Sequence, residues 1–248
     1  MQRFYIPSFE KQETFIIEDK NIFHQLVKVL RIREWEKIIF FDWKTQKDYI
    51  YEIVEINKKT IKTKLLEEVE KNTELNFDLN LFQALPNKLE KIEYILQKWV
   101  EVWFKKFVFY RSERSQKLVI SDKKEERLKK IIVEAVEQSG RNFVPELQIL
   151  SKNLDKKNIG WKSLFLHTKN NNSQNLKDFI DSLSIEGFSS LKKIEENINL
   201  FIWPEWWFSE SEIKNFEEKK FARIYLWNRI LRTETAWIVV GFTLWQML

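Results

Sequence analysis

The sequence predicts an α/β protein of two domains, a small β-rich unit at residues 1–70 and a larger domain at 71–248. Short runs rich in Ile, Phe, Tyr and Val, which are typical of strands, fill the first part. From residue 77 onward such runs alternate with segments of helical apolar spacing, the pattern of a mainly parallel sheet. The polar stretch 67–76, with two acidic clusters, is the expected linker between them.

The elements expected in the N-terminal unit are short. Asp19 can cap a helix that runs through Leu30, because its side chain can accept hydrogen bonds from the first backbone N–H groups. The apolar residues of this segment follow helical spacing: Phe23, Leu26, Val27 and Leu30. Strands are expected at 3–6, 37–42, 48–56 and 60–66.

In the larger domain, a strand at 78–84 precedes a helix that Pro86 opens, and a strand at 106–110 precedes a helix that begins at Asp122. The apolar stripes of these helices indicate core packing: Leu89, Ile92, Leu96, Trp99 and Trp103 in the first, and Leu128, Ile131, Ile132 and Ala135 in the second. Further strands are expected at 163–167, 199–202 and 222–226, with a polar loop around 170–175, a helix at 209–219 and a last helix that begins at Thr233 or Thr235.

Composition excludes several kinds of site. The chain has no cysteine, which excludes disulfides, thiolate zinc sites and cysteine nucleophiles. His24 and His167 lie far apart without a metal-ligand pattern, so no metal site is expected. The longest apolar stretch, 236–245, is too short to span a bilayer and the start lacks a signal-like apolar region, so we expect a cytoplasmic protein with no membrane partner. The net charge of +5 permits an anionic partner.

Glycine is scarce and tryptophan abundant. Average usage predicts about 17 glycines in a chain of this length, whereas there are 4, together with 11 tryptophans. Several tryptophans stand in turn-like contexts that favour glycine, such as Asp42-Trp43-Lys44. An aromatic-rich core would explain any one of them, but the adjacent Trp206 and Trp207 form no helical or strand stripe. We therefore hypothesise that UGA codons meaning glycine were translated as tryptophan; UGG codons at the eleven positions would contradict this.

Chemistry in open α/β sheets is expected beyond the carboxyl ends of the strands, where loops lead into helices. Three segments occupy such positions: 166–168, 202–209 and 226–236.

Two of these segments carry a family resemblance. Phe201-Ile202-Trp203-Pro204-Glu205-Trp206-Trp207-Phe208-Ser209-Glu210 resembles the motif Ile-Gly-Pro-Glu-Gly-Gly-Phe-Ser with all three glycines replaced, and 226–236 resembles the second motif of the same family with one glycine replaced. Further matches occur at 3–5, 27–31, 83–86, 112–115 and 137–142. Over nearly its whole length, in the same order, the chain resembles the ribosomal RNA small subunit methyltransferase E family.

This resemblance implies a PUA-like β-barrel followed by a SPOUT-class domain with a deep trefoil knot, which nothing in the periodicity predicts. It also implies a homodimer that binds S-adenosylmethionine in the knot and methylates N3 of a specific uridine in 16S rRNA of the small ribosomal subunit. The implied cofactor-binding residues are Leu166, His167, Ile202, Trp203, Pro204, Glu205, Trp206, Leu226, Trp227, Asn228, Ile230 and Leu231.

Tryptophans in these loops raise a physical difficulty, because glycines there would let the backbone approach the cofactor. We call Trp203, Trp206, Trp207 and Trp227 the loop tryptophans. As bulky side chains they would crowd the pocket, so weak cofactor binding is expected from the chain as written and normal binding from a glycine-restored version.

Methyl transfer to a ring nitrogen needs positioning and an environment that favours the deprotonated uracil N3. Arg232 and Glu234 are therefore the catalytic candidates, although a carboxylate near a helix start often only favours the helix dipole. The candidates for RNA contact are Arg3, Lys28, Arg31, Arg114, Arg141 and Arg229, and any of them could instead form an ordinary salt bridge. Lys28 and Arg31 are expected on one helical face.

Two other functions remain open at this point. A SPOUT enzyme could methylate a ribose 2′-oxygen, although the 138–142 segment and the expected barrel argue against it. A noncatalytic RNA-binding protein would fit a cofactor pocket filled by tryptophan.

Overall fold

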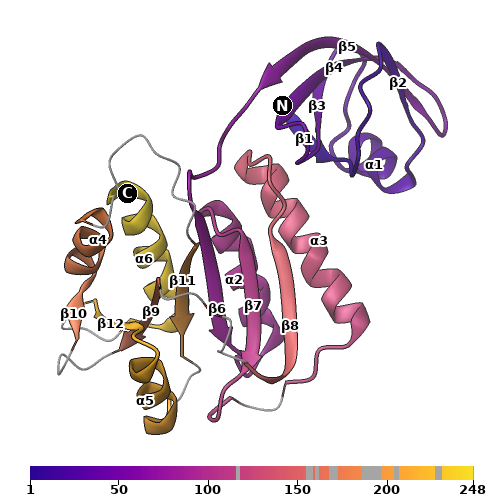
Figure 1. Cartoon of the computed structure of the whole chain (residues 1–248). Coiled ribbons are helices and arrows are strands. Elements are labelled where there is room, and N and C mark those ends of the chain that lie inside the picture. The colour runs from indigo at the N-terminus through magenta and orange to yellow at the C-terminus, as the bar shows by residue number, and fades with distance from the viewer. Residues whose placement is uncertain are drawn as a thin grey trace. The chain divides into compact units, whose positions relative to one another are not determined.

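The computed structural model describes residues 1–115, 118–154, 159, 162–167, 173–185, 197–203, 207–226 and 231–247. The chain forms two compact units (Figure 1). The first consists of Met1–Glu74 and Val136–Val144, and the second of Leu75–Ala135 and Pro145–Leu248. The segment 136–144 therefore belongs to the N-terminal unit, which the division at residues 70 and 71 did not anticipate.

The first unit is built on a five-stranded sheet in the order β1-β3-β4-β5-β2, in which β1 pairs with β3 in parallel and the other pairs are antiparallel. Its strands are β1 (Gln2–Tyr5), β2 (Thr14–Ile17), β3 (Lys37–Phe41), β4 (Lys47–Ile56) and β5 (Ile61–Glu70). The sheet curves around an aromatic core (Figure 1), in which Phe9 and Tyr51 pack against Phe40 with ring centroids 5.5 and 5.4 Å away. Four of the five strands were predicted, and β2 was not.

Residues 67–70, the acidic start of the expected linker, form the end of strand β5. β5 continues to Glu70, where it pairs with Lys47 of β4. Lys11 lies 2.7 Å from the Glu68 carboxylate, and Lys47 also forms an ion pair with it. Hydrogen bonds from Lys11 and Lys47 lower the pKa of Glu68 to about 2. These neighbouring cations offset the negative charge that made the segment resemble a linker.

The helix expected after Asp19 is present, but it begins as an α-helix and ends as a π-helical turn. Asp19 caps α1 (Lys20–His24) by accepting hydrogen bonds from the backbone N–H groups of Asn21 and Ile22, both at 2.9 Å. The chain continues as a π-helical turn, η1 (Gln25–Val29). Arg31 lies beyond its end with a left-handed φ of 54°. Lys28 and Arg31 therefore do not share a helical face, because the helix ends between them.

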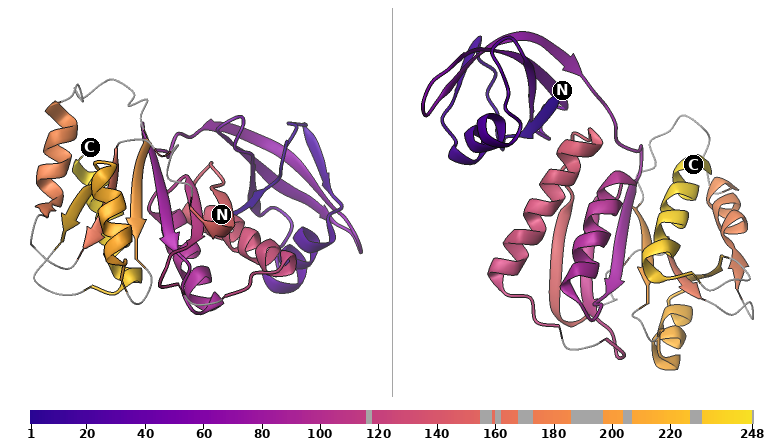
Figure 2. Two further views of the ribbon diagram at one scale, coloured as in Figure 1. Left: turned by 60° about the horizontal axis from the view of Figure 1, so that its bottom comes forward. Right: turned by 180° about the vertical axis from the view of Figure 1, so that it is seen from behind.

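The second unit contains a wholly parallel seven-stranded sheet in the order β10-β12-β9-β11-β6-β7-β8, which Figure 2 shows from two further directions. The strands are β6 (Asp78–Ala84), β7 (Lys106–Arg111), β8 (Glu146–Asn153), β9 (Ser163–His167), β10 (Gln174–Asn175), β11 (Asn197–Ile202) and β12 (Ala222–Tyr225). The helices are α2 (Leu89–Glu101), α3 (Asp122–Ser139), α4 (Leu176–Ile185), α5 (Glu210–Glu218) and α6 (Thr233–Met247), and α3 ends within the segment 136–144 of the first unit. This arrangement confirms the predicted parallel sheet; β8, β10 and α4 were missed. The trefoil knot stays a prediction.

Helices α2 and α6 contact each other through tryptophan. The rings of Trp99 and Trp237 are 4.2 Å apart, and both indole Nε1 atoms are buried without a hydrogen-bond partner in the described structure. Ile92, Leu96 and Trp99 are buried as predicted. Trp103 was assigned to this stripe wrongly, because the helix ends before it and its ring stacks on Trp245 at 4.5 Å.

The backbone at three tryptophans has the conformation that favours glycine. Seven non-glycine residues of the described structure have positive φ, and three of them are Trp35 (73°), Trp103 (64°) and Trp207 (64°). A side chain with a β-carbon is strained in this left-handed region, whereas glycine is not. This geometry supports the hypothesis that these positions belong to glycine.

None of the described helices has the length and apolar character needed to cross a bilayer.

Candidate active site

The carboxyl ends of three parallel strands lie side by side in the second unit. β9 lies between β11 and β12, with Phe201 opposite Phe165 on one side and Tyr225 opposite His167 on the other. The segments that the sequence singled out at residues 166, 202 and 226 therefore leave the sheet at one edge. This is the edge at which parallel α/β sheets bind ligands.

A buried acceptor without a partner lies at this edge. Gln83, near the end of β6, donates through Nε2 to the carbonyl oxygens of Trp203 at 3.1 Å and Ala84 at 2.8 Å. Its Oε1 is buried and has no hydrogen-bond partner in the described structure. A buried amide oxygen left unpaired is costly, so a ligand with an N–H or O–H donor would be stabilised here.

Two tryptophans pack together directly after β11. Trp203 is 5% exposed, and its ring lies 4.7 Å from that of Trp207, whose backbone is left-handed. Their indoles occupy space beside the strand ends, where glycine would leave the backbone accessible. Several predicted site residues lie outside the described residues: Pro204, Glu205, Trp206, Trp227, Asn228, Arg229 and Ile230.

His167 is oriented by its neighbours. Its Nδ1 lies 3.1 Å from a guanidinium nitrogen of Arg223 on β12, and Arg223 also forms an ion pair with Glu217 at 3.1 Å. The imidazole therefore lies against a cation. We expect any cofactor contact of His167 to come from its backbone.

A carboxylate network fixes the start of α5. Ser209 and Glu212 form a reciprocal capping box, with Glu212 N–H donating to Ser209 Oγ at 3.1 Å and Ser209 N–H donating to Glu212 Oε2 at 2.9 Å. The buried Glu212 also accepts from the backbone N–H of Glu113 at 3.2 Å. The Glu113 carboxylate in turn accepts from Ser211 Oγ at 2.7 Å. These bonds hold the loop after β7, which carries the exposed Arg114, against the loop that leads into α5.

Tyr110 is buried beside this network. Its hydroxyl has no hydrogen-bond partner in the described part of the chain. Burial raises the pKa of Tyr110 well above its ordinary value, and the negative charge of Glu212 raises it further. The phenol therefore stays neutral over the physiological range.

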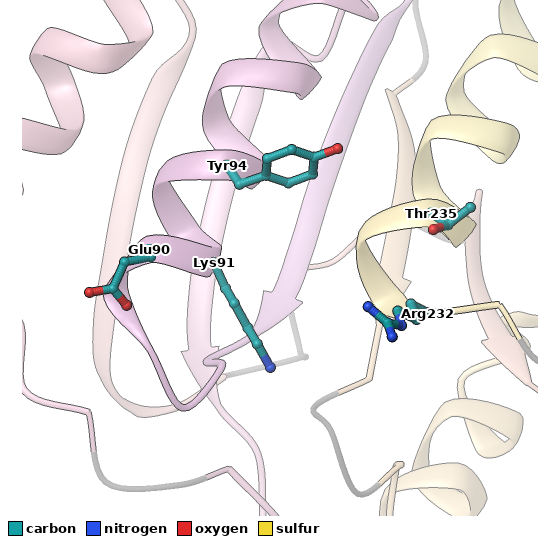
Figure 3. Close-up of a pocket in the computed structure, with 5 residues that line it drawn as sticks. All are labelled: Glu90, Lys91, Tyr94, Arg232 and Thr235. Carbon is teal, nitrogen blue, oxygen red and sulfur yellow. The ribbon is translucent and has the colours of Figure 1, made fainter.

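A cavity of about 420 Å³ opens between the first turns of α2 and α6, which follow β6 and β12. It is lined by Glu90, Lys91, Tyr94, Arg232 and Thr235. Figure 3 shows Lys91 and Tyr94 extending from α2 toward the side of α6, where Arg232 and Thr235 lie. The structure thus brings the exposed Arg232 together with a second cation and an aromatic ring.

The other predicted residues near α6 are less informative. Leu231 is half-buried, and the carbonyl oxygen of Arg232 accepts from the backbone N–H groups of Thr235 and Ala236 at 2.9 Å, so Arg232 stands at the helix start. Glu234 lies in the first turn, but its side chain is outside the described structure. Its role stays a prediction.

The N-terminal candidates separate into buried and exposed groups. The Arg3 side chain is 7% exposed, forms an ion pair with Asp48 at 2.7 Å, donates to the carbonyl of Arg141 at 3.1 Å and lies over the Phe41 ring at 4.2 Å. The Arg141 guanidinium is 3% exposed and paired with Glu74. These ion pairs are the alternative that the sequence left open for both arginines, and RNA contact by Arg3 and Arg141 stays a prediction.

The exposed candidates lie at the end of η1 and beyond it. Lys28 and Arg31 are exposed, as are Arg33 and Trp35. Trp35 is 72% exposed. The three exposed cations suit the binding of phosphates.

Sequence reasoning did not anticipate the surroundings of four residues: the unpaired Oε1 of Gln83, the place of Lys91 and Tyr94 beside the cavity, and the hydrogen bonds of Glu212. Lys91 and Tyr94 were on the polar face of a helix, which is usually only solvated. The available signal was their place in the helix that directly follows the carboxyl end of β6.

Comparison with known proteins gives consistent results. Residues 73–245 match the family model for an RNA methyltransferase domain, and residues 17–66 match that for an RNA methyltransferase PUA domain. The chain is 31% identical to ribosomal RNA small subunit methyltransferase E 2 of Borreliella burgdorferi, over 89% of this chain and 86% of that protein. It is 28% identical to ribosomal RNA small subunit methyltransferase E of Buchnera aphidicola, over 96% of this chain and 90% of the relative.

A solved structure also matches along the whole chain. The crystal structure of a ribosomal RNA small subunit methyltransferase E from Neisseria gonorrhoeae, bound to S-adenosyl methionine, superposes with a TM-score of 0.80 at 26% identity. The match covers 99% of this chain and 97% of that one.

Proposed function

Because this chain belongs to the ribosomal RNA small subunit methyltransferase E family, we propose that it methylates N3 of a specific uridine in 16S rRNA. It is an S-adenosylmethionine-dependent methyltransferase of small-subunit ribosomal RNA. The target atom is the finer part of the proposal. The PUA-like N-terminal unit and the parallel α/β domain inferred from the motifs are both confirmed.

The described residues fit S-adenosylmethionine at the edge formed by β9, β11 and β12. The unpaired Gln83 Oε1 is an acceptor suited to an amine or ring N–H of the cofactor. Leu166, Ile202 and Leu226 would supply backbone and apolar contacts around it. When bound, the cofactor supplies an electrophilic methyl group on a sulfonium. The indoles of Trp203 and Trp207 compete for the neighbouring space.

Arg232 is the residue to which we assign transition-state stabilisation. Uracil N3 must lose its proton to become nucleophilic, and the anion spreads charge onto the neighbouring oxygens. A guanidinium within hydrogen-bond reach favours this anion and orients its planar edge. Arg232 is exposed and lines the cavity, so its donors can reach a base held there. Glu234 remains the candidate to accept the proton.

RNA contact is proposed for Lys28 and Arg31 in the N-terminal unit, for Arg114 after β7, and for Arg229. Each neutralised phosphate releases counterions, so binding should weaken steeply with salt. Since the substrate is ribosomal, we place the enzyme in the cytoplasm.

A homodimer is also proposed, with α6 at the contact between copies. Val239, Phe242 and Met247 on this helix are 42%, 50% and 43% exposed. Burying such side chains against a second copy is favourable. Sedimentation of the purified protein tests this.

The observation that carries the function is the convergence of three strand ends beside a cavity lined by Arg232. The test is transfer of a radiolabelled methyl group to unmodified 30S subunits, followed by nucleoside analysis. We expect label in 3-methyluridine. Label in a 2′-O-methylated nucleoside would favour the ribose-methylating alternative, and RNA binding without any transfer would favour the noncatalytic one. The assay is run on the chain as written and on a version with glycine at the four loop tryptophans.

A further inference from the structure

We propose that Tyr94 and Lys91 form the subsite that holds the target nucleotide after it leaves its stack, with Tyr94 against the base and Lys91 on the phosphate. This inference rests on the proposed function and names the substrate-binding residues of the same site. Neither residue belongs to the motifs that carry the family resemblance.

The reaction itself requires such a subsite. N3 lies on the Watson–Crick edge of uracil, so it is inaccessible in a base pair. Enzymes that modify bases therefore act on single strands or extrude the nucleotide into a pocket, where aromatic side chains replace the lost stacking.

The cavity between α2 and α6 has the size and place for this. Its volume of about 420 Å³ falls in the range of roughly 300–1,000 Å³ that small-molecule pockets show. Arg232, to which we assign stabilisation of the uracil anion, lines the same cavity. A uracil base held there would be within reach of the Arg232 guanidinium.

The side chains lining the cavity match a nucleotide in chemistry. Tyr94 is 46% exposed, which leaves part of its ring accessible for stacking on a base. Lys91 supplies an ammonium group, the kind of point charge that binds phosphate. Figure 3 shows both side chains extending from α2 toward the side of Arg232, whereas Glu90 extends away from it. Glu90 lines the cavity as well, on the side away from Arg232.

The test separates stacking, phosphate binding and ordinary helix effects. Tyr94→Ala removes the ring, and Tyr94→Phe keeps it. Lys91→Met removes the charge, and Lys98→Met is its matched control on α2, because Lys98 forms an ion pair with Glu101 at 2.9 Å and does not line the cavity. Methyl transfer to 30S subunits gives KM and kcat, and calorimetry gives the affinity for S-adenosylmethionine.

We expect Tyr94→Ala to raise the KM for 30S subunits about tenfold or more, as loss of one stacked base does, with Tyr94→Phe within about twofold of the parent. Lys91→Met should raise KM and reduce its salt dependence by about one charge. Lys98→Met should change neither. Unchanged KM in Tyr94→Ala, equal loss in Tyr94→Phe, or a parallel loss of cofactor affinity would overturn the proposal. A Tyr94→Ala protein with an altered sedimentation coefficient would assign the ring to a contact between copies and would also overturn it.

A second measurement does not depend on activity. An oligonucleotide that carries 5-iodouridine is crosslinked to the parent protein by light, and the modified peptide is identified by mass spectrometry. Crosslinking in 89–101, lost in Tyr94→Ala, supports the subsite even if no methyl is transferred. Methyl transfer with the crosslink elsewhere would leave the proposed function standing and refute the subsite.

Discussion

Replacing Trp35 tests directly whether a tryptophan occupies a position that belongs to glycine. Trp35 has φ 73° and is 72% exposed, so its indole contributes little burial to offset the backbone strain. The backbone N–H of Trp35 donates to the carbonyl oxygen of Ile53 at 2.8 Å, and the backbone N–H of Ile53 donates to the carbonyl oxygen of Glu36 at 2.9 Å. These bonds hold the turn in place, so it cannot relax to negative φ.

The difference in unfolding free energy between Trp35→Gly and Trp35→Ala follows from two opposing effects. A residue with a β-carbon costs about 1–2 kcal/mol in the left-handed region. Glycine removes that strain but adds roughly 0.5–1 kcal/mol of backbone entropy to the unfolded state. Trp35→Gly should therefore unfold with a free energy about 1 kcal/mol higher than Trp35→Ala, which keeps the β-carbon.

Trp43 is the matched control in the same unit. It is 46% exposed, and its φ is not positive, so the expectation that its turn-like context favours glycine is wrong at this position. Here glycine should be less stable than alanine by about 0.5–1 kcal/mol. Subtracting the two glycine–alanine differences removes the unfolded-state effect and leaves the strain of about 1–2 kcal/mol.

Urea unfolding followed by far-UV circular dichroism measures all four variants. The slopes of the transitions should agree, so that midpoints report stability. If Trp35→Gly is no more stable than Trp35→Ala, the strain argument is wrong. The codons at the eleven tryptophan positions test the hypothesis independently: UGA supports glycine in the natural protein, and UGG contradicts it.

Three further predictions follow from the second unit. Glycine at the four loop tryptophans should strengthen S-adenosylmethionine binding in calorimetry, and equal affinity before and after would refute the crowding argument. Tyr110→Phe should not lower stability at pH 7, because the buried hydroxyl has no partner in the described structure. Because the fold raises the pKa of Tyr110, the parent protein keeps its full stability below the ordinary tyrosine pKa and loses stability as pH rises above about 10. In urea titrations between about pH 8 and 11, the variant should therefore lose less stability than the parent. Glu212→Gln should lower the unfolding free energy by about 1–3 kcal/mol, because two backbone N–H groups lose a charged acceptor; an effect no larger than that of Ser211→Ala would show that the capping network contributes little.

Two strands of the parallel sheet, β6 and β9, were predicted with the correct bounds. Both are buried along most of their length, and their apolar residues mark them in the sequence although β6 also carries the buried Asn80 and Gln83. β2, β8 and β10 escaped prediction because they are short or polar. Gln174–Asn175 forms β10 only through its pairing with β12, and a two-residue polar strand has no hydrophobic pattern from which it could be predicted.

The candidate site was predictable in topology but not in side-chain contacts. Strand ends meet at one edge of any parallel sheet, so the convergence of 166, 202 and 226 followed from the order of elements. The roles of charged residues depended on partners remote in sequence. For Arg3, the sequence left an RNA contact and a salt bridge both open, because its partner Asp48 lies 45 residues away.

The return of residues 136–144 to the N-terminal unit has a practical consequence for anyone dissecting this protein. Arg3 donates to the side chain of Asn142, the backbone N–H of Tyr5 donates to Glu137 at 2.8 Å, and Arg141 pairs with Glu74. A truncated gene that stops at codon 74 would encode a module whose first strand lacks Asn142 and Glu137 and whose Glu74 lacks Arg141. The N-terminal unit cannot be exchanged between enzymes by one crossover, because two separate stretches of the gene encode it.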